Sequence, residues 1–250
     1  MRALRLLLRL PLLALHLLVL LPLTLLLLAL PRRGGAMPGG GGVQGWAVRA
    51  WSAGLLRIFG LRVRRYGTPL PGAVLFVANH VSWLDITLIH SQIWAGFVSK
   101  AEVADWPLIG RLADIGGTIY HHRGSQNSLH GVMHQMLARL QAERPVAVFP
   151  EGRANDGAAL GVFHARIFQP AVLAPAPVQP VALRYGQGGE LQTRVAFAPG
   201  ERFLANFLRL LGEPGGIAEL HFLEPASATE EGRRRLAETC RERVAAVLAR

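Results

Sequence analysis

The chain has 250 residues, of which 51% are hydrophobic and 17% charged, so it is long enough for an α/β domain and too apolar for a disordered protein. Its single cysteine, Cys240, excludes an intrachain disulfide and any metal site built from several cysteines. The net charge of +11 is typical of nucleic-acid binders, but its distribution argues against that class. Residues 1–65 hold ten arginines and no acid, whereas residues 66–250 carry 17 basic and 16 acidic groups.

Residues 1–33 are predicted to form a hydrophobic membrane anchor. The run from 10 to 31 has no charged residue and is mostly leucine. At about 1.5 Å per residue, a helix of this length crosses a hydrocarbon core roughly 30 Å thick. A cleaved signal peptide is the alternative, but Arg32 and Arg33 follow the run without a small-residue cleavage site.

The sequence leaves the orientation of this anchor open. Three arginines lie close to each of its ends, so the positive-inside rule gives no preference. Pro11 and Pro22 are expected to break a straight helix. A re-entrant or interfacial hairpin with both flanks on one side therefore fits better than a simple span.

Two segments follow the anchor. Residues 34–42 are rich in glycine and predict a flexible linker. Residues 43–60 place Trp46, Trp51 and Leu55 at helical spacing among arginines, which predicts an amphipathic helix at the surface of an anionic bilayer. A helix packed on the folded domain, with its arginines in solvent, fits this pattern equally well.

Residues 61–250 alternate short apolar runs with helical stretches and predict an α/β domain. Strands are predicted at 63–66, 73–78, 96–99, 118–121, 146–149, 178–185, 194–197 and 217–223. Helices are predicted at 83–94, 105–114, 125–143, 201–211 and 228–249. Ser227 and Glu230 have the spacing of a capping box for the last helix, on whose apolar stripe Cys240 lies.

The stretch 73–88 indicates acid–base chemistry. A buried strand leads into Asn79 and His80, and Asp85 follows at the start of a helix. Imidazole accepts protons near neutrality, and a carboxylate bonded to its Nδ1–H fixes the tautomer and stabilises the imidazolium. There is no serine elbow, so we interpret His80 as a general base acting on a substrate hydroxyl. Alternatively, Asp85 simply caps its helix.

The stretch 146–157 is a second candidate for substrate binding. A buried strand ends in Pro150, Glu151, Gly152 and Arg153. Glycine lets the backbone approach a ligand closely, and the guanidinium fork matches a phosphate. Taken alone, this pattern slightly favours an ordinary strand-to-loop turn.

Together these stretches resemble the glycerolipid acyltransferase family, which includes the 1-acyl-sn-glycerol-3-phosphate acyltransferases. Four blocks of that family occur in order, as NHVSWLD at 79–85, GTIYHHR at 117–123, FPEGR at 149–153 and APVQPV at 176–181. The resemblance spans residues 61–185. Arg153 stands where the family usually has threonine, Ala154 where it has arginine, and His122 where aspartate is common.

The resemblance implies a glycerolphosphate acyltransferase-like fold, in which helices flank a mixed, mostly parallel central sheet, so that 61–250 is the catalytic domain. It implies that His80 is the general base and that Asp85 holds it. Substrate contacts are implied for Asn79, Lys100, Arg123, Glu151, Gly152 and Arg153.

The implied reaction moves a fatty acyl group from acyl-CoA or acyl-acyl-carrier protein to the sn-2 hydroxyl of 1-acyl-sn-glycerol-3-phosphate, giving phosphatidate. No metal and no cofactor beyond this co-substrate is implied. Asn155, Asp156 and Gly157, followed by Phe163 and His164, resemble the subgroup that acts on lyso-ornithine lipids, so another lysolipid acceptor stays open. An inactive lipid-binding membrane protein is a third possibility, against which the intact His80 and Asp85 argue.

The same resemblance implies a place in the cell and a set of partners. The expected location is a bacterial inner membrane, with the catalytic domain on its cytoplasmic face. The expected partners are the lysophospholipid acceptor, acyl-CoA or acyl carrier protein, and an anionic bilayer surface. Nucleic acid is not expected among them, because the body of the chain is almost neutral.

Overall fold

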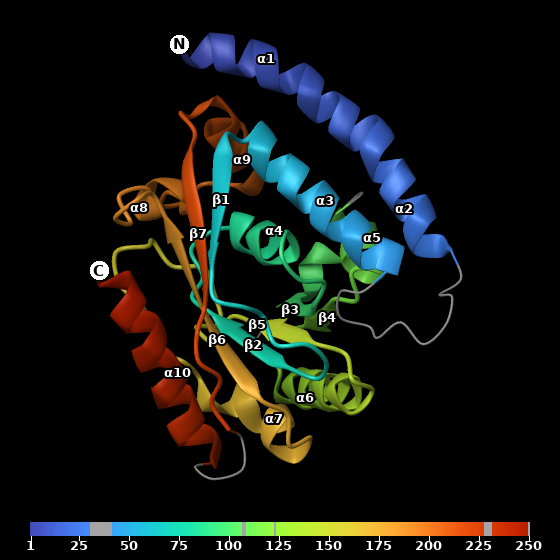
Figure 1. The fold of residues 1–250 in the computed structure, drawn as a ribbon, viewed down its shortest axis with the longest axis vertical. Coiled ribbons are helices and arrows are strands. Elements are labelled where there is room, and N and C mark those ends of the chain that lie inside the picture. Colours follow the sequence, from blue (N-terminus) through green and yellow to red (C-terminus); the bar gives the residue numbers. More distant parts are fainter. Residues whose placement is uncertain (31–41, 107–108, 123, 228–231, 250) are drawn as a thin grey trace.

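The computed structural model describes residues 1–30, 42–106, 109–122, 124–227 and 232–249. A seven-stranded sheet runs through its centre in the order β1-β7-β6-β2-β5-β3-β4 (Figure 1). All neighbouring strands are parallel except β6 and β7. The strands are β1 (Leu61–Tyr66), β2 (Leu75–Ala78), β3 (Gly96–Lys100), β4 (Ile119–His121), β5 (Val146–Val148), β6 (Val178–Tyr185) and β7 (Gly216–Phe222). The expected mixed, mostly parallel sheet is confirmed.

Helices cover both faces of the sheet and enclose two apolar clusters (Figure 1). Along β2, Phe76 faces one cluster while Leu75 and Val77 face the other, as the two-residue period of a strand requires. The helices that follow the N-terminal segment are α3 (Gly42–Ile58), α4 (Leu84–His90), α5 (Ile109–Ile115), α6 (Gln126–Gln141), α7 (Gln169–Leu173), α8 (Gln192–Val195), α9 (Phe203–Gly212) and α10 (Gly232–Leu248). Short 3₁₀ turns occupy Ala101–Val103 and Ala165–Phe168.

The strand predicted at 194–197 is wrong, because the chain there forms the short helix α8 and then a loop. Val195 and Ala196 are buried, which explains the apolar run, but they are buried as a turn packed against the sheet. Gln192 makes this turn possible: its side-chain oxygen accepts from the backbone N–H of Tyr185, the last residue of β6. A buried apolar run of this length does not distinguish a strand from a helical turn.

The C-terminal helix is close to its prediction. It ends at Leu248, and Cys240 is completely buried in the cluster that α10 forms with α6 and α7. Glu230, half of the predicted capping box, lies outside the described residues.

The N-terminal segment forms one continuous curved helix. It consists of α1 (Arg2–Leu15), a π-helical turn (His16–Leu20) and α2 (Leu21–Ala29). The break expected at Pro11 and Pro22 is therefore wrong, and no hairpin forms within 2–29. The wider π turn directly precedes Pro22 and accommodates a residue that has no N–H to donate.

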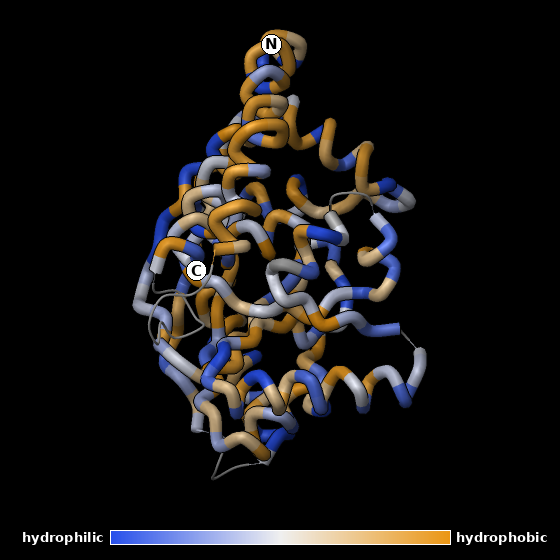
Figure 2. Tube along the Cα trace, turned by 90° about the vertical axis from the view of Figure 1, so that its right-hand side faces the viewer, coloured by the Kyte–Doolittle hydropathy of each residue, from blue (hydrophilic) through white to orange (hydrophobic). Residues whose placement is uncertain are grey.

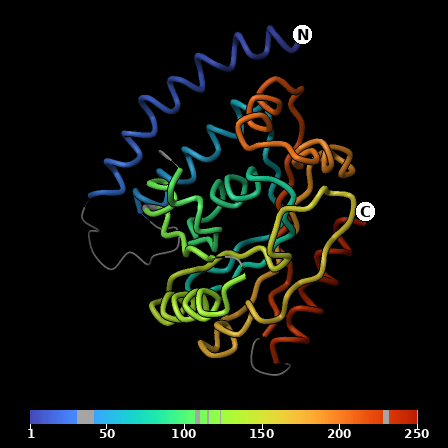
Figure 3. The backbone as a smooth tube through the Cα atoms, turned by 180° about the vertical axis from the view of Figure 1, so that it is seen from behind, coloured from blue at the N-terminus to red at the C-terminus, as the bar shows by residue number. Residues whose placement is uncertain are grey.

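This helix is long and apolar enough to cross a membrane, by length and composition. It is the one such helix in the described part of the chain, and Figure 2 shows mostly hydrophobic colours near the N-terminus, interrupted by hydrophilic positions. Figures 1 and 3 show it running along the outside of the domain, where α1 contacts α9 and α2 contacts α3.

Helix α3 packs on the domain that contains the sheet. It contacts α4, and Leu55 and Leu56 are buried in the same cluster as Phe76. This packing supports the second interpretation of residues 43–60, a helix that belongs to the domain. Almost all of the predicted linker, 34–42, lies outside the described residues, so the division of the N-terminal region stays a prediction.

Candidate active site

The candidate site lies at the carboxyl ends of the parallel strands, where open α/β sheets bind their ligands. His80 comes two residues after β2, and Glu151 comes three residues after β5, its neighbour in the sheet. Lys100 is the last residue of β3, on the other side of β5. The sheet therefore brings together residues that are far apart in the sequence.

His80 and Asp85 form the pair that the sequence predicts. The distance from His80 Nδ1 to Asp85 Oδ2 is 2.8 Å. Because an ionised carboxylate only accepts hydrogen bonds, this contact places the proton on Nδ1 and leaves the Nε2 lone pair free. In the described part of the chain, His80 Nε2 has no hydrogen-bond partner, and 17% of the side chain is exposed. The imidazole stacks on Phe149, with ring centroids 3.9 Å apart, which fixes its plane.

Asp85 is completely buried and accepts four hydrogen bonds. Oδ2 accepts from His80 and from the backbone N–H groups of Val81 and Ser82. Oδ1 accepts from the hydroxyl of Tyr185, at 2.7 Å. Asp85 is therefore not a simple cap of α4, because it binds N–H groups of the turn before the helix and holds the imidazole as well.

Tyr185 is a site residue that the sequence does not reveal. It ends β6, one hundred residues from Asp85, and it is completely buried. Burial and the nearby Asp85 carboxylate raise the pKa of Tyr185 well above its usual value, so the phenol remains a donor. No motif marks it, because it follows the fourth family block without belonging to it.

Glu151 holds the backbone of His80. Its Oε1 accepts from the N–H of His80 at 2.8 Å, and Oε2 accepts from Gly161 N–H at 2.7 Å and from the side chain of Asn155. The backbone N–H of Asn155 in turn donates to the carbonyl of His80. Burial raises the pKa of Glu151, although the hydrogen bonds from His80 and Gly161 oppose this rise.

The loop that follows Glu151 is also fixed from its far end. Arg241 of α10 donates to the carbonyls of Leu160 and Gly161, at 3.0 and 2.8 Å. Figure 3 shows this yellow loop lying beside the red C-terminal helix. Arg241 is a second residue that sequence reasoning missed, since an arginine in a charged helix carries no signal of such a contact.

Asn79 is turned toward the sheet. Its Nδ2 donates to the carbonyl of Leu183, and its Oδ1 accepts from the N–H of the same residue. The side chain therefore replaces one more residue of backbone pairing between β2 and β6. Both of its polar groups are used within the protein.

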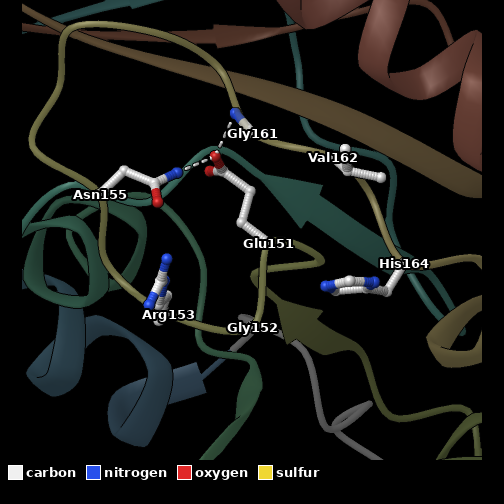
Figure 4. Close-up of a pocket in the computed structure, with 7 residues that line it drawn as sticks. All are labelled: Glu151, Gly152, Arg153, Asn155, Gly161, Val162 and His164. Carbon is white, nitrogen blue, oxygen red and sulfur yellow. Dashed lines mark hydrogen bonds between the residues drawn. The ribbon is translucent and has the colours of Figure 1, made fainter.

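An open cavity of about 600 Å³ lies beside Glu151. Figure 4 shows the residues that line it, which are Glu151, Gly152, Arg153, Asn155, Gly161, Val162 and His164. Gly152 has φ +76°, a conformation that favours glycine, and this turn sends the chain away from the sheet. Arg153, which is exposed, and His164 give the cavity two groups that can bind an anion.

The structure describes Lys100 but not Arg123. The Lys100 ammonium lies over the ring of Trp106, 5.2 Å from its centroid. Trp106 also packs on Phe203, which contacts Trp83 in the turn between His80 and Asp85. Arg123 lies outside the described residues, so its predicted contact with a phosphate stays a prediction.

Glu151 lines the cavity and also accepts from the backbone N–H of His80, so it connects the cavity to the His80–Asp85 pair. An imidazole held in this way is suited to acid–base chemistry. The family model described as Acyltransferase matches residues 62–184. Lyso-ornithine lipid O-acyltransferase of Pseudomonas aeruginosa is 36% identical over 197 residues, covering 78% of this chain and 76% of that protein. The chain belongs to this family of lysolipid acyltransferases, so it is an enzyme of lipid metabolism.

Two further similarities describe its place in the family. The 1-acyl-sn-glycerol-3-phosphate acyltransferase of Neisseria gonorrhoeae is 36% identical over 140 residues, which cover 56% of this chain and 55% of that protein. The crystal structure of the 1-acyl-sn-glycerophosphate acyltransferase PlsC from Thermotoga maritima matches with a TM-score of 0.70 at 20% identity, covering 100% of this chain and 99% of that one. This last match confirms the fold.

Proposed function

We propose that this enzyme transfers a fatty acyl group from an acyl thioester to the free hydroxyl of a lysolipid, with His80 as general base. One observation carries the proposal: Asp85 binds Nδ1 of His80 at 2.8 Å, and Nε2 is left without a partner among the described residues. A neutral imidazole in this state accepts a proton at Nε2.

In the proposed reaction, His80 Nε2 removes the proton from the acceptor hydroxyl while its oxygen attacks the thioester carbonyl. A carbon–oxygen bond forms, the carbon–sulfur bond breaks, and the imidazolium returns the proton to the departing thiolate. The products are the acylated lipid and free coenzyme A or acyl carrier protein. Asp85 stabilises the imidazolium in between. The reaction needs no metal and no other cofactor.

For the acceptor we propose lyso-ornithine lipid first. The Pseudomonas aeruginosa relative and a Brucella abortus relative, 33% identical over 209 residues and covering 78% of that protein, both carry the name lyso-ornithine lipid O-acyltransferase. In addition, Ala154 stands where the family usually has an arginine, so one guanidinium follows the turn at Gly152. The carboxylate of such a lipid suits the single guanidinium of Arg153.

Lysophosphatidate is the second candidate acceptor. The Neisseria gonorrhoeae relative with that acceptor in its name is equally identical, although over a shorter stretch. Arg153 and His164, which line the cavity beside Glu151, are also suitable ligands for a phosphate. We further propose that the catalytic domain faces the cytoplasm of the cell, where coenzyme A and acyl carrier protein thioesters are made.

The experiment supplies the full-length enzyme with one labelled acyl thioester and, separately, with lyso-ornithine lipid and lysophosphatidate. We expect acylated product from at least one acceptor and a loss of about 10²- to 10⁴-fold in His80→Ala. His134→Ala is the matched control, because His134 is an exposed histidine on α6. Near-normal turnover by a folded His80→Ala enzyme would disprove the role of His80, and no product from either acceptor would disprove the substrate class.

A further inference from the structure

Helix α9 carries an apolar stripe of which only one end is covered. Leu204, Leu208 and Leu211 are spaced i, i+4 and i+7 and therefore share one face of the helix. Leu211 is completely buried, whereas Leu208 is 43% and Leu204 is 65% exposed. An exposed leucine is common on protein surfaces, but a stripe that begins under another helix and continues into the open indicates an incomplete contact.

The covered end of α9 lies against the N-terminal helix. Arg9 donates to the carbonyls of Leu211 and Glu213, both at 2.8 Å, and Arg5 donates to the carbonyl of Gly212 at 3.2 Å. These carbonyls belong to the end of α9 and have no partner within the helix. The two arginines thus attach the N-terminal helix to the domain directly beside the exposed stripe.

The N-terminal helix exposes leucines along the same stretch. Leu4, Leu7, Leu8 and Leu12 are 59%, 70%, 61% and 53% exposed. The apolar surface of the membrane-crossing candidate and the open stripe of α9 are therefore neighbours, held together by the contacts of α1 with α9.

A neighbouring face of α9 connects to the candidate active site. Phe203 and Phe207 pack on Trp83, whose indole N–H donates to Asn206. Trp83 lies two residues before Asp85 in the turn that supports His80. Helix α9 thus contacts this turn on one face and carries the exposed leucines on the next.

We propose that the open face of α9, formed by Leu204 and Leu208, enters the hydrocarbon region of the bilayer beside the N-terminal helix. The bilayer is the occupant because the stripe is continuous with a helix that is itself suited to hydrocarbon. Arg202, exposed at the start of α9, then lies at the level of the lipid headgroups. This second insertion places the catalytic turn at the membrane surface, where a lysolipid hydroxyl resides.

The test uses a fluorescent label at single positions of the full-length protein. Cys240 is completely buried, so an introduced surface cysteine is the reactive one. Leu204→Cys is labelled with nitrobenzoxadiazole, which brightens and shifts to the blue in hydrocarbon. Leu173→Cys is the matched control, because Leu173 is 57% exposed on α7, at the far end of the molecule from α9 in Figure 1. Leu12→Cys reports on the N-terminal helix.

Each protein is mixed with vesicles of phosphatidylethanolamine and phosphatidylglycerol, with and without bromine on the acyl chains. We expect brominated chains to quench the labels at 204 and 12 to a similar degree and to leave the label at 173 unchanged. A label at 204 that stays unquenched while the one at 12 is quenched overturns the proposal. A label at 204 already shifted to the blue without vesicles, and unquenched with them, overturns it in favour of a second copy of the chain. No quenching at 12 overturns it as well, since the proposal depends on the N-terminal helix.

Discussion

The carboxylate of Asp85 is the residue on which the candidate site depends. It is completely buried, so its oxygens must find their hydrogen-bond partners within the protein. Three N–H groups donate to Oδ2, and the Tyr185 hydroxyl donates to Oδ1. Tyr185 is the single donor to Oδ1 among the described residues, so its loss leaves that oxygen unsatisfied.

We expect Tyr185→Phe to lower kcat. Without the hydroxyl, Oδ1 of the buried Asp85 has no donor among the described residues, so the carboxylate is held less firmly and orients the imidazole less well. The value of kcat should therefore fall, with little change in KM for either substrate. The measurement is kcat and KM for the preferred acceptor.

Tyr66→Phe is the control for this variant. The Tyr66 hydroxyl also faces a carboxylate, that of Glu219, but it lies on the edge strand β1. Its kcat should match that of the wild type. An unchanged kcat in Tyr185→Phe would show that the tyrosine contributes packing alone.

Arg153 is expected to bind the anionic group of the acceptor. Arg153→Ala should raise the acceptor KM by about ten- to a hundredfold, the equivalent of about 1.5–3 kcal/mol for a charged hydrogen bond. Arg153→Lys should recover part of this loss, because an ammonium lacks the planar fork. Measuring KM with both lipids identifies the acceptor that uses this residue, and an equal KM in Arg153→Ala would make Arg153 a solvated loop residue.

The elements of the chain were predictable to different degrees. The central strands β2 and β5 are buried on both faces and give continuous apolar runs, so their positions follow from the sequence. The length of the apolar run predicts the N-terminal helix. Its continuity through Pro22 depends on the π turn before that residue, which no residue pattern predicts.

The residues of the candidate site were also predictable to different degrees. His80, Asp85 and Glu151 lie in short motifs directly after strands, where local sequence is informative. Tyr185 and Arg241 reach the site through tertiary packing across 100 and 80 residues of chain, and single residues of common types carry no signal of it.

At the scale of elements, α3 is expected to stabilise the catalytic domain. Leu56→Ala should lower the free energy of unfolding by about 2–5 kcal/mol, because this leucine is completely buried. Leu26→Ala on α2 is the control, since Leu26 is 64% exposed. Thermal unfolding of both variants in the same detergent compares them. Equal melting temperatures of the two variants would support the alternative interpretation of α3 as an interfacial helix.

The carboxylate of Glu201, just before α9, should make the stability of the fold depend on pH. Hydrogen bonds from Arg209, and to a smaller extent Asn206 and the backbone of Ala198, lower the pKa of Glu201 to about 2. A lowered pKa stabilises the fold above the unfolded value near 4.3, and this contribution disappears as the pH falls toward 2. Glu201→Gln should therefore melt a few degrees below the wild type at neutral pH, and the difference should shrink between about pH 4 and 2. A constant difference would contradict this origin.

The whole molecule concentrates its positive charge in the N-terminal region, yet we expect membrane binding to be mainly apolar. Arg5 and Arg9 donate to carbonyls of the domain, and the helix that carries them exposes a row of leucines. In about 1 M salt, charge attraction is screened beyond roughly 3 Å, whereas burial of leucine in hydrocarbon persists. Full-length protein should therefore sediment with vesicles in high salt and be released by detergent. Release by salt alone would assign the binding to the arginines.

The contacts of Arg5 and Arg9 also determine the order of events during synthesis. Their partners, residues 211–213, are separated from them by 202 to 207 positions in the chain. A ribosome adds roughly 5–20 residues per second, so the N-terminal helix waits about 10–40 s before its docking surface exists. During that interval the membrane offers the helix an apolar surface and the domain does not. We therefore expect insertion to precede docking, so that the domain completes its fold against a helix that is already in place.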